Sequence, residues 1–110
     1  MARRIHWFII AILLVYGLAW NPAVALAQGQ EIFNDTCAMC HGKDGTGNGP
    51  AGKSFSSSPD DFTDPSFWKG DVKDKITTTI KNGHGPMPAF TLSPGKIEAV
   101  IAYMEQKFKP

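Results

Sequence analysis

The sequence predicts a small all-α domain built from about three to four helices. Three segments, 29–41, 71–82 and 93–108, carry apolar residues at helical spacing. No two segments show the alternating pattern and tight turn of a β-hairpin. The chain has 110 residues, and its N-terminal part differs so strongly in composition from the rest that a second core would not fit.

The N-terminal segment has the features of an export signal. Two arginines open the chain, Trp7 to Trp20 is almost wholly apolar, and Ala25-Leu26-Ala27 supplies small residues where a signal peptidase cuts. We therefore expect residues 1–27 to be a cleaved signal peptide, residues 28–110 to be the mature domain, and the periplasm to be its location. Retention of the segment as a membrane anchor stays open, because residues 7–27 approach the length of a membrane span.

Removal of this segment changes the charge of the protein. The whole chain has 11 basic and 10 acidic side chains, and the loss of both arginines leaves nine lysines against the same ten acids. A net charge near −1 argues against a nucleic-acid partner and predicts weak electrostatic steering toward protein partners. We expect a monomer that meets a membrane only transiently, unless the signal segment is kept.

The first helix of the domain is expected over residues 29–41, because small or apolar residues recur on one side and Gly42 follows. Residues 43–70 are rich in glycine, serine, proline and aspartate, which predicts a long irregular segment. An irregular segment of this length needs a core or a bound group to pack against.

The second helix is expected to start at Asp71, which can cap it, and to stop at Gly83. Val72, Ile76 and Ile80 recur every four residues between these points. The run of three threonines before Ile80 weakens this prediction, since branched side chains also favour strands.

The third helix has the clearest signals. Ser93 is in position to cap it, and Pro94 suits the first helical position. Its apolar stripe at helical spacing consists of Ile97, Val100, Ile101, Met104 and Phe108.

Cys37-Ala38-Met39-Cys40-His41 has the spacing of a covalent haem attachment site. On a helix, Cys37, Cys40 and His41 fall within about one turn and face one ligand. Two thiols can therefore add to the vinyl groups of one haem c while the imidazole reaches the iron from the same side. A disulfide or redox pair leaves His41 unexplained, and structural zinc needs four ligands, so both alternatives are weaker.

An iron that carries electrons without binding gases needs a sixth ligand, and the sequence favours Met87. Met39 points away from the cysteine face, and Met104 belongs to the apolar stripe of the third helix. Prolines on both sides of Met87 stiffen the loop that presents its sulfur. Two alternatives stay open: Met87 only fills a gap in the core, or His84 provides the ligand instead.

The sequence resembles class I cytochromes c. The resemblance covers nearly all of residues 28–110, and it is nearest to small bacterial monohaem carriers and to the cytochrome domains of terminal oxidases. It rests on Gly29, Phe33, the motif of residues 37–41, Gly49-Pro50, Met87-Pro88-Ala89-Phe90 and Tyr103.

The resemblance implies the cytochrome c fold around one covalent haem, held by Cys37 and Cys40, with His41 and Met87 as axial ligands of the iron. It also implies that the carbonyl of Pro50 accepts the second ring N–H of His41. Gly29 and Phe33 would meet Tyr103 where the first and last helices cross. The serine-rich segment after Pro50 departs from the family, which leaves the residues around the haem propionates open.

These residues predict an electron carrier rather than an enzyme, with a donor and an acceptor protein as partners. We expect low-spin iron in both oxidation states and no carbon monoxide binding by the reduced protein. The alternatives are a ligand-binding, sensing or peroxidase-like haem protein with an open iron site, and an electron-transfer subunit of a membrane-bound oxidoreductase.

Residues 47–54 also match the phosphate-loop pattern. A true phosphate loop follows a strand and opens a helix, whereas this segment follows the cysteine motif. We interpret the match as chance.

Overall fold

The computed structural model describes residues 2–19 and 21–110, so Met1 and the Trp20 that ends the predicted apolar run lie outside the described residues. The described chain forms the α-helices α1 (Ala2–Ala19), α2 (Pro22–Ile32), α3 (Ala38–His41), α4 (Val72–Asn82) and α5 (Pro94–Phe108). One π-helical turn, η1 (Phe33–Cys37), and two 3₁₀ turns, η2 (Gly52–Ser54) and η3 (Pro65–Trp68), complete the order. Within these ranges the extended pairing is limited to one isolated bridge, so the all-α prediction is confirmed.

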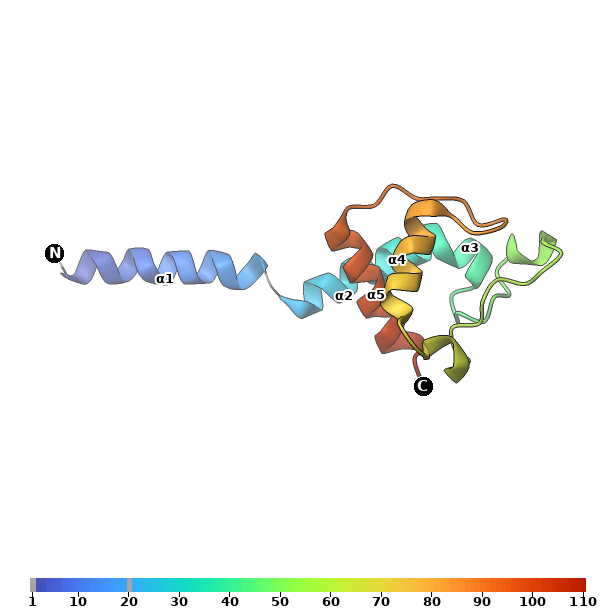
Figure 1. Cartoon of the computed structure of the whole chain (residues 1–110). Coiled ribbons are helices and arrows are strands. Elements are labelled where there is room, and N and C mark those ends of the chain that lie inside the picture. Colours follow the sequence, from blue (N-terminus) through green and yellow to red (C-terminus); the bar gives the residue numbers. More distant parts are fainter. Residues whose placement is uncertain (1, 20) are drawn as a thin grey trace.

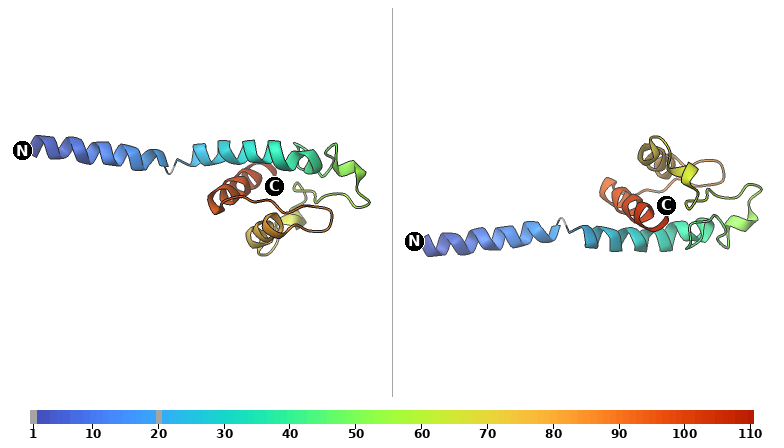
Figure 2. Two further views of the ribbon diagram at one scale, coloured as in Figure 1. Left: turned by 90° about the horizontal axis from the view of Figure 1, so that it is seen from above. Right: turned by 90° about the horizontal axis from the view of Figure 1, so that it is seen from below.

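Helix α1 projects away from the other helices, as both Figure 1 and Figure 2 show. The radius of gyration is 18.4 Å, against about 13 Å for a compact chain of this length. The large apolar side chains described on α1, such as Trp7 and Phe8, are mostly exposed. Over the described residues, none of the helices combines the length and the hydropathy that a bilayer crossing requires.

The helix that carries the cysteine motif is longer than the sequence predicts. It starts at Pro22 rather than at Gly29, and it runs through α2, η1 and α3 to His41. The side chain of Asn21 accepts a hydrogen bond from the Ala23 amide at 3.0 Å, and Pro22 occupies the first position, so the helix start is well capped. This cap falls inside the segment that the sequence assigns to the export signal.

Helices α2 and α5 cross at Gly29, as the family resemblance implies. A Cβ atom at Gly29 would lie 2.6 Å from the Ala99 carbonyl carbon and 2.9 Å from the Tyr103 Cβ. Only glycine permits this approach. One turn later, the Phe33 ring lies 5.6 Å from the Tyr103 ring and 5.1 Å from the Phe108 ring.

Helix α5 buries every residue of its predicted stripe. Ser93 accepts a hydrogen bond from the Lys96 amide at 3.3 Å, and Pro94 is the first helical residue, so both predicted start signals are confirmed. The stripe packs against Phe33 and against Ile76 and Ile80 of α4, and together they form one core. The aromatic rings of this core, joined by Phe62, extend it toward the long loop.

Helix α4 has the predicted bounds with one difference at its start. Asp71 stands at the N-cap, but its side chain makes no capping hydrogen bond. At the other end Gly83 has φ +74°, a conformation that L side chains rarely adopt, and its amide donates to the Thr79 carbonyl at 2.8 Å. The predicted stop at Asn82-Gly83 is therefore confirmed.

Candidate functional site

The described residues enclose a cavity of about 280 Å³, near the lower end of the range of about 300–1,000 Å³ for cofactor sites. Side chains from every part of the domain line it. The helix that carries the cysteine motif contributes Phe33, Thr36, Cys37, Cys40 and His41. The long loop contributes Phe55, Ser57, Ser58, Pro59, Asp60, Phe62 and Phe67. The other lining residues come from α4, from the loop after it and from α5: Lys75, Ile76, Thr79, Ile80, His84, Pro86, Met87, Pro88, Phe90, Val100 and Met104.

Cys37 and Cys40 are free thiols, and both are half-buried against the cavity. Burial, with a smaller contribution from Cys40, raises the pKa of Cys37 from 9.0 to about 11. The thiol is therefore protonated at neutral pH and makes a poor nucleophile unaided. The structure brings both predicted attachment residues to one wall of one cavity.

His41 ends the same helix, and its ring is held on two sides. It stacks on Phe62 with the ring centroids 4.5 Å apart and an interplanar angle of 20°. The ring atom Nδ1 lies 3.4 Å from the carbonyl oxygen of Asp60. Burial lowers the pKa of His41, while this hydrogen bond and the Asp60 charge oppose the shift. A neutral imidazole with Nδ1 engaged leaves Nε2 free to bind a metal.

The hydrogen bond that the resemblance implies between the His41 ring and the Pro50 carbonyl stays a prediction. Among the described residues, the carbonyl within hydrogen-bond distance of the His41 Nδ1 is that of Asp60. Pro50 is exposed and lines a separate shallow pocket behind the motif, beside Met39. The amides on either side of Pro50 donate to the carbonyls of Cys40 and Met39 at the end of α3.

The glycine-rich loop caps the motif helix. The amides of residues 42, 51, 49 and 47 donate to the carbonyls of Ala38, Met39, Cys40 and His41 at 2.8–3.1 Å. These are the four carbonyls that a helix end leaves without partners. A Cβ atom at Gly49 would lie 2.6 Å from the Ala38 carbonyl oxygen, so this glycine is needed for the approach. The phosphate-loop pattern in this segment has a structural explanation, and it follows no strand.

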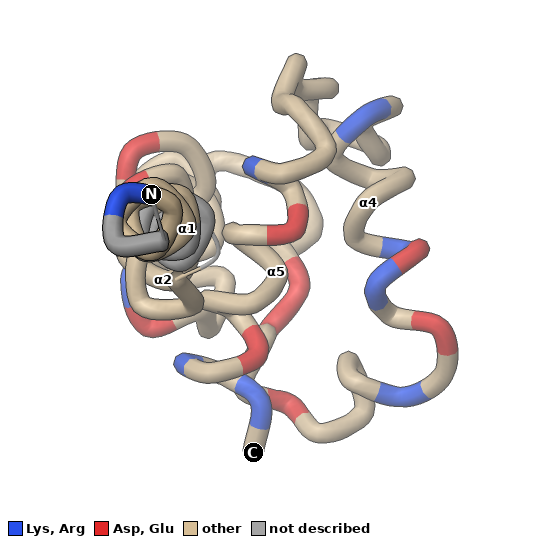
Figure 3. The backbone as a smooth tube through the Cα atoms, turned by 90° about the vertical axis from the view of Figure 1, so that its left-hand side faces the viewer, with Lys and Arg blue, Asp and Glu red and all other residues tan. Residues whose placement is uncertain are grey.

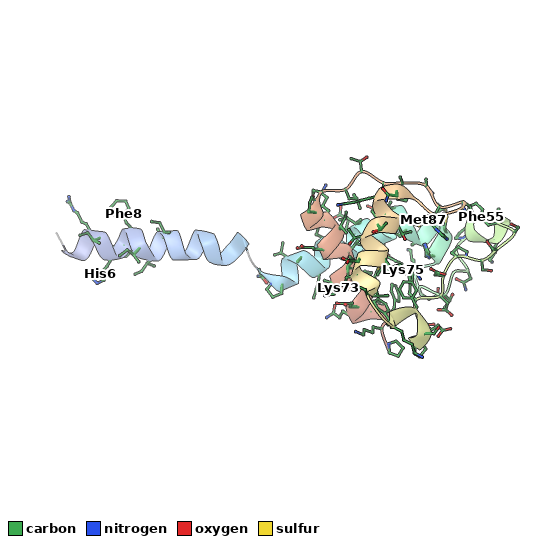
Figure 4. All side chains as sticks on the ribbon, in the orientation of Figure 1. His6, Phe8, Phe55, Lys73, Lys75 and Met87 are labelled. Atoms are coloured by element: carbon green, nitrogen blue, oxygen red, sulfur yellow. The ribbon has the colours of Figure 1, made fainter. Side chains whose placement is uncertain are left out.

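Met87 reaches the cavity from the loop after α4 (Figure 4). The amide of Met87 donates to the carbonyl of His84 at 2.9 Å, and the reverse bond measures 3.0 Å, so the two residues close a tight turn. Of the other described methionines, Met39 is 59% exposed, while Met104 is buried in the core and touches the cavity from α5. Met87 is thus the methionine that comes from a loop facing the motif helix.

This donor set fits haem c. A largely apolar cavity has two thiols and an imidazole on one wall, and a thioether enters from another element. Phe62 is one of the loop aromatics expected to bury the haem, and it lines the cavity. The sequence reasoning missed its stacking on the His41 ring and the Asp60 carbonyl beside that ring, because the contact with Asp60 spans 19 residues. Within the described chain, no group of three or more His, Cys, Asp or Glu side chains could hold a bare metal ion.

Three comparisons with known proteins bear on this site. The family model described as "Cytochrome C oxidase, cbb3-type, subunit III" matches residues 24–104. The chain is 38% identical to the cbb3-type cytochrome c oxidase subunit FixP of Azorhizobium caulinodans over 91 residues, which cover 80% of this chain and 29% of that protein. It is 37% identical to the subunit CcoP of Rubrivivax gelatinosus over 84 residues, which cover 76% and 25%.

A third relative is nearer in size. Cytochrome c6 of Gloeothece citriformis is 30% identical over 106 residues, which cover 90% of this chain and 89% of that protein. The chain therefore spans less than a third of the two oxidase subunits but almost the whole of this cytochrome c6. No solved structure matches significantly.

Proposed function

Because the chain belongs to the family of the cbb3-type oxidase subunit III, a class I c-type cytochrome, we propose that it is an exported carrier of single electrons between protein partners. Membership establishes an electron-transfer haem protein with covalent haem c. The observation that supports the further proposal is the cavity, on which Cys37, Cys40, His41 and Met87 converge.

We assign the roles of the four residues as follows. Cys37 and Cys40 would form the thioether bonds to the haem, and His41 and Met87 would bind its iron. When bound, haem supplies the one-electron couple between ferric and ferrous iron. A complete set of axial ligands suits electron transfer, because it leaves no position for oxygen or peroxide.

The residues around His41 and Met87 influence the reduction potential of the haem iron. The stacked Phe62 ring and the Asp60 carbonyl fix the plane and tautomer of His41. Apolar side chains from α4, α5 and the loop line the cavity, and they disfavour the additional positive charge of the ferric state. A thioether ligand also favours the reduced state more than a second imidazole does. The site is therefore expected to have a higher potential than a bis-histidine haem.

The export proposal rests on residues 1–27. They comprise α1, a projecting helix with exposed apolar side chains, and the start of α2, in which residues 22–25 are also exposed. Removal of this segment would take away the Asn21 cap and the first residues of α2 but would keep Gly29 in the chain. Figure 3 shows acidic and basic residues interspersed over the domain, which fits brief encounters with partners better than one strong attraction.

A second candidate is an electron-transfer subunit or domain of a membrane-bound oxidase. The observation that favours it is the similarity to FixP and CcoP. Co-purification with an oxidase, or retention of residues 1–27 in the intact mass, would favour this candidate over a free carrier.

The test uses protein produced together with haem-attachment machinery. Intact mass and a pyridine haemochrome spectrum should show one haem joined by two thioethers. The reduced protein should be low-spin and should not bind carbon monoxide. A colourless chain with two titratable thiols would overturn the haem assignment, and rapid carbon monoxide uptake would instead indicate an open-site sensor or peroxidase-like protein.

A matched pair of variants tests the methionine ligand. Met87→Ala should abolish the methionine-to-iron charge-transfer band and lower the reduction potential, because the replacement ligands favour ferric iron more. Met39→Ala removes an exposed methionine and should leave both properties unchanged. Equal spectra for the two variants would contradict the assignment of Met87.

A further inference from the structure

His84 and Met87 form one antiparallel pair in which each amide donates to the carbonyl of the other, at 3.0 and 2.9 Å. Residues directly opposed in such a pair carry their side chains on the same face, with Cβ atoms about 4.5–5.5 Å apart. Both side chains line the cavity that His41 also lines. The turn therefore presents an imidazole and a thioether side by side to one space.

The two side chains differ in how firmly they are held. Met87 is half-buried and packs against the core, whereas His84 is exposed. Gly85, between them, has open space around its Cβ position, so the tip of the turn is not clamped by neighbours. An exchange of one side chain for the other requires movement within four residues and leaves the rest of the domain in place.

We propose that His84 is a second ligand for the sixth coordination position of the haem iron and takes that position when the Met87 sulfur is not bound. This inference rests on the proposed function, in which His41 and Met87 are the axial ligands. In the exchange the iron–sulfur bond breaks and a bond forms between iron and the lone pair of a neutral imidazole nitrogen. No electron is transferred.

This second ligand keeps the iron six-coordinate without the thioether. Loss of the sulfur would then lower the reduction potential, because an imidazole favours ferric iron more than a thioether does. It would not turn the carrier into a protein that binds gases or peroxide readily.

The experiment compares the haem-loaded variants Met87→Ala and Met87→Ala/His84→Ala. The single variant should remain low-spin in the ferric state, with the electron paramagnetic resonance spectrum of two imidazole ligands. The double variant should become high-spin, and its ferrous form should bind carbon monoxide at least tenfold faster. Imidazole added to the double variant should restore the spectrum of the single variant.

A matched control excludes ligation by another histidine. Where the N-terminal segment is retained, Met87→Ala/His6→Ala should keep the low-spin spectrum of Met87→Ala. High-spin iron in Met87→Ala, with a carbon monoxide rate equal to that of the double variant, would overturn the role of His84. That result differs from failure of the proposed function, which would appear as missing covalent haem or as carbon monoxide binding in the unmutated protein.

Discussion

The close approach of α2 and α5 at Gly29 makes a sharp prediction. Alanine at this position would place its Cβ 2.6 Å from the Ala99 carbonyl carbon and 2.9 Å from the Tyr103 Cβ. Ordinary contacts begin near 3.4 Å, and the obstacle is partly backbone, which cannot rotate away. Helices α2 and α5 would have to separate along the crossing that also aligns Phe33.

Overpacking of this kind destabilises a domain by about 1–3 kcal/mol. The backbone obstacle at Gly29 puts the cost of the alanine substitution toward the upper end of this range. The higher helix propensity of alanine offsets about 0.5–1 kcal/mol of that cost. A net loss of about 2 kcal/mol corresponds to a fall of roughly 8–16 °C in the melting temperature of a domain this small. Thermal unfolding of the haem-loaded protein, followed by circular dichroism, measures it.

The same substitution at Gly95 is the control. Gly95 also lies in a helix, near the start of α5, but its Cβ position is open and its φ is not positive. Gly95→Ala should therefore stabilise the protein by about 0.4–1 kcal/mol. Equal shifts of the same sign in Gly29→Ala and Gly95→Ala would refute the packing argument.

Three further predictions concern the site. Phe62→Ala removes a buried ring that stacks on the His41 imidazole, and it should lower the free energy of unfolding in urea by about 3–5 kcal/mol. A loss below 1 kcal/mol would contradict the place of Phe62 in the core. Gly83→Ala places a Cβ 2.7 Å from the Met87 carbonyl oxygen at a φ of +74°, so the methionine-to-iron charge-transfer band should weaken more than in Gly85→Ala, where φ is +54° and nothing lies within 4 Å of the Cβ position. An equal loss of the band in these two variants would contradict the contact. In the folded haem-free chain the pKa of Cys37 is about 11 against 9.0 for an ordinary thiol, so its alkylation at pH 8 should be about 100-fold slower than in urea. Equal alkylation rates in the folded and the urea-unfolded chain would contradict the burial of Cys37. Because the thiol of the unfolded chain loses its proton at a lower pH than that of the folded chain, the free energy of unfolding should also fall as the pH rises from 9 to 11.

The parts of the fold that the sequence predicted are those with local causes. Ser93 and Pro94 start α5, and Gly83 ends α4, because each acts through its own backbone. The spacing of Cys37, Cys40 and His41 likewise places three side chains on one wall by helix geometry alone.

The features that escaped prediction depend on contacts between distant segments. The neighbours of the His41 ring, Asp60 and Phe62, lie about 20 residues along the chain and reach it only through the path of the loop. The role of Pro50 comes from the family resemblance alone and stays a prediction, while the amides of its neighbours donate to the end of α3. The cap at Asn21 was overlooked because its segment was assigned to export.

The two halves of the long loop differ in what they allow. Between Gly42 and Ala51, four amides are spaced to match four consecutive carbonyls of the helix that ends in His41. Adding or deleting a residue between Gly42 and Gly47 would shift the three later amides against their carbonyls. A few residues later, Lys53 to Ser58 are exposed, and a change in length at Ser56 would break none of these four hydrogen bonds, although it would shift Phe55, Ser57 and Ser58 at the cavity. Relatives of this chain are therefore expected to vary in length in the second half and to keep a fixed length in the first.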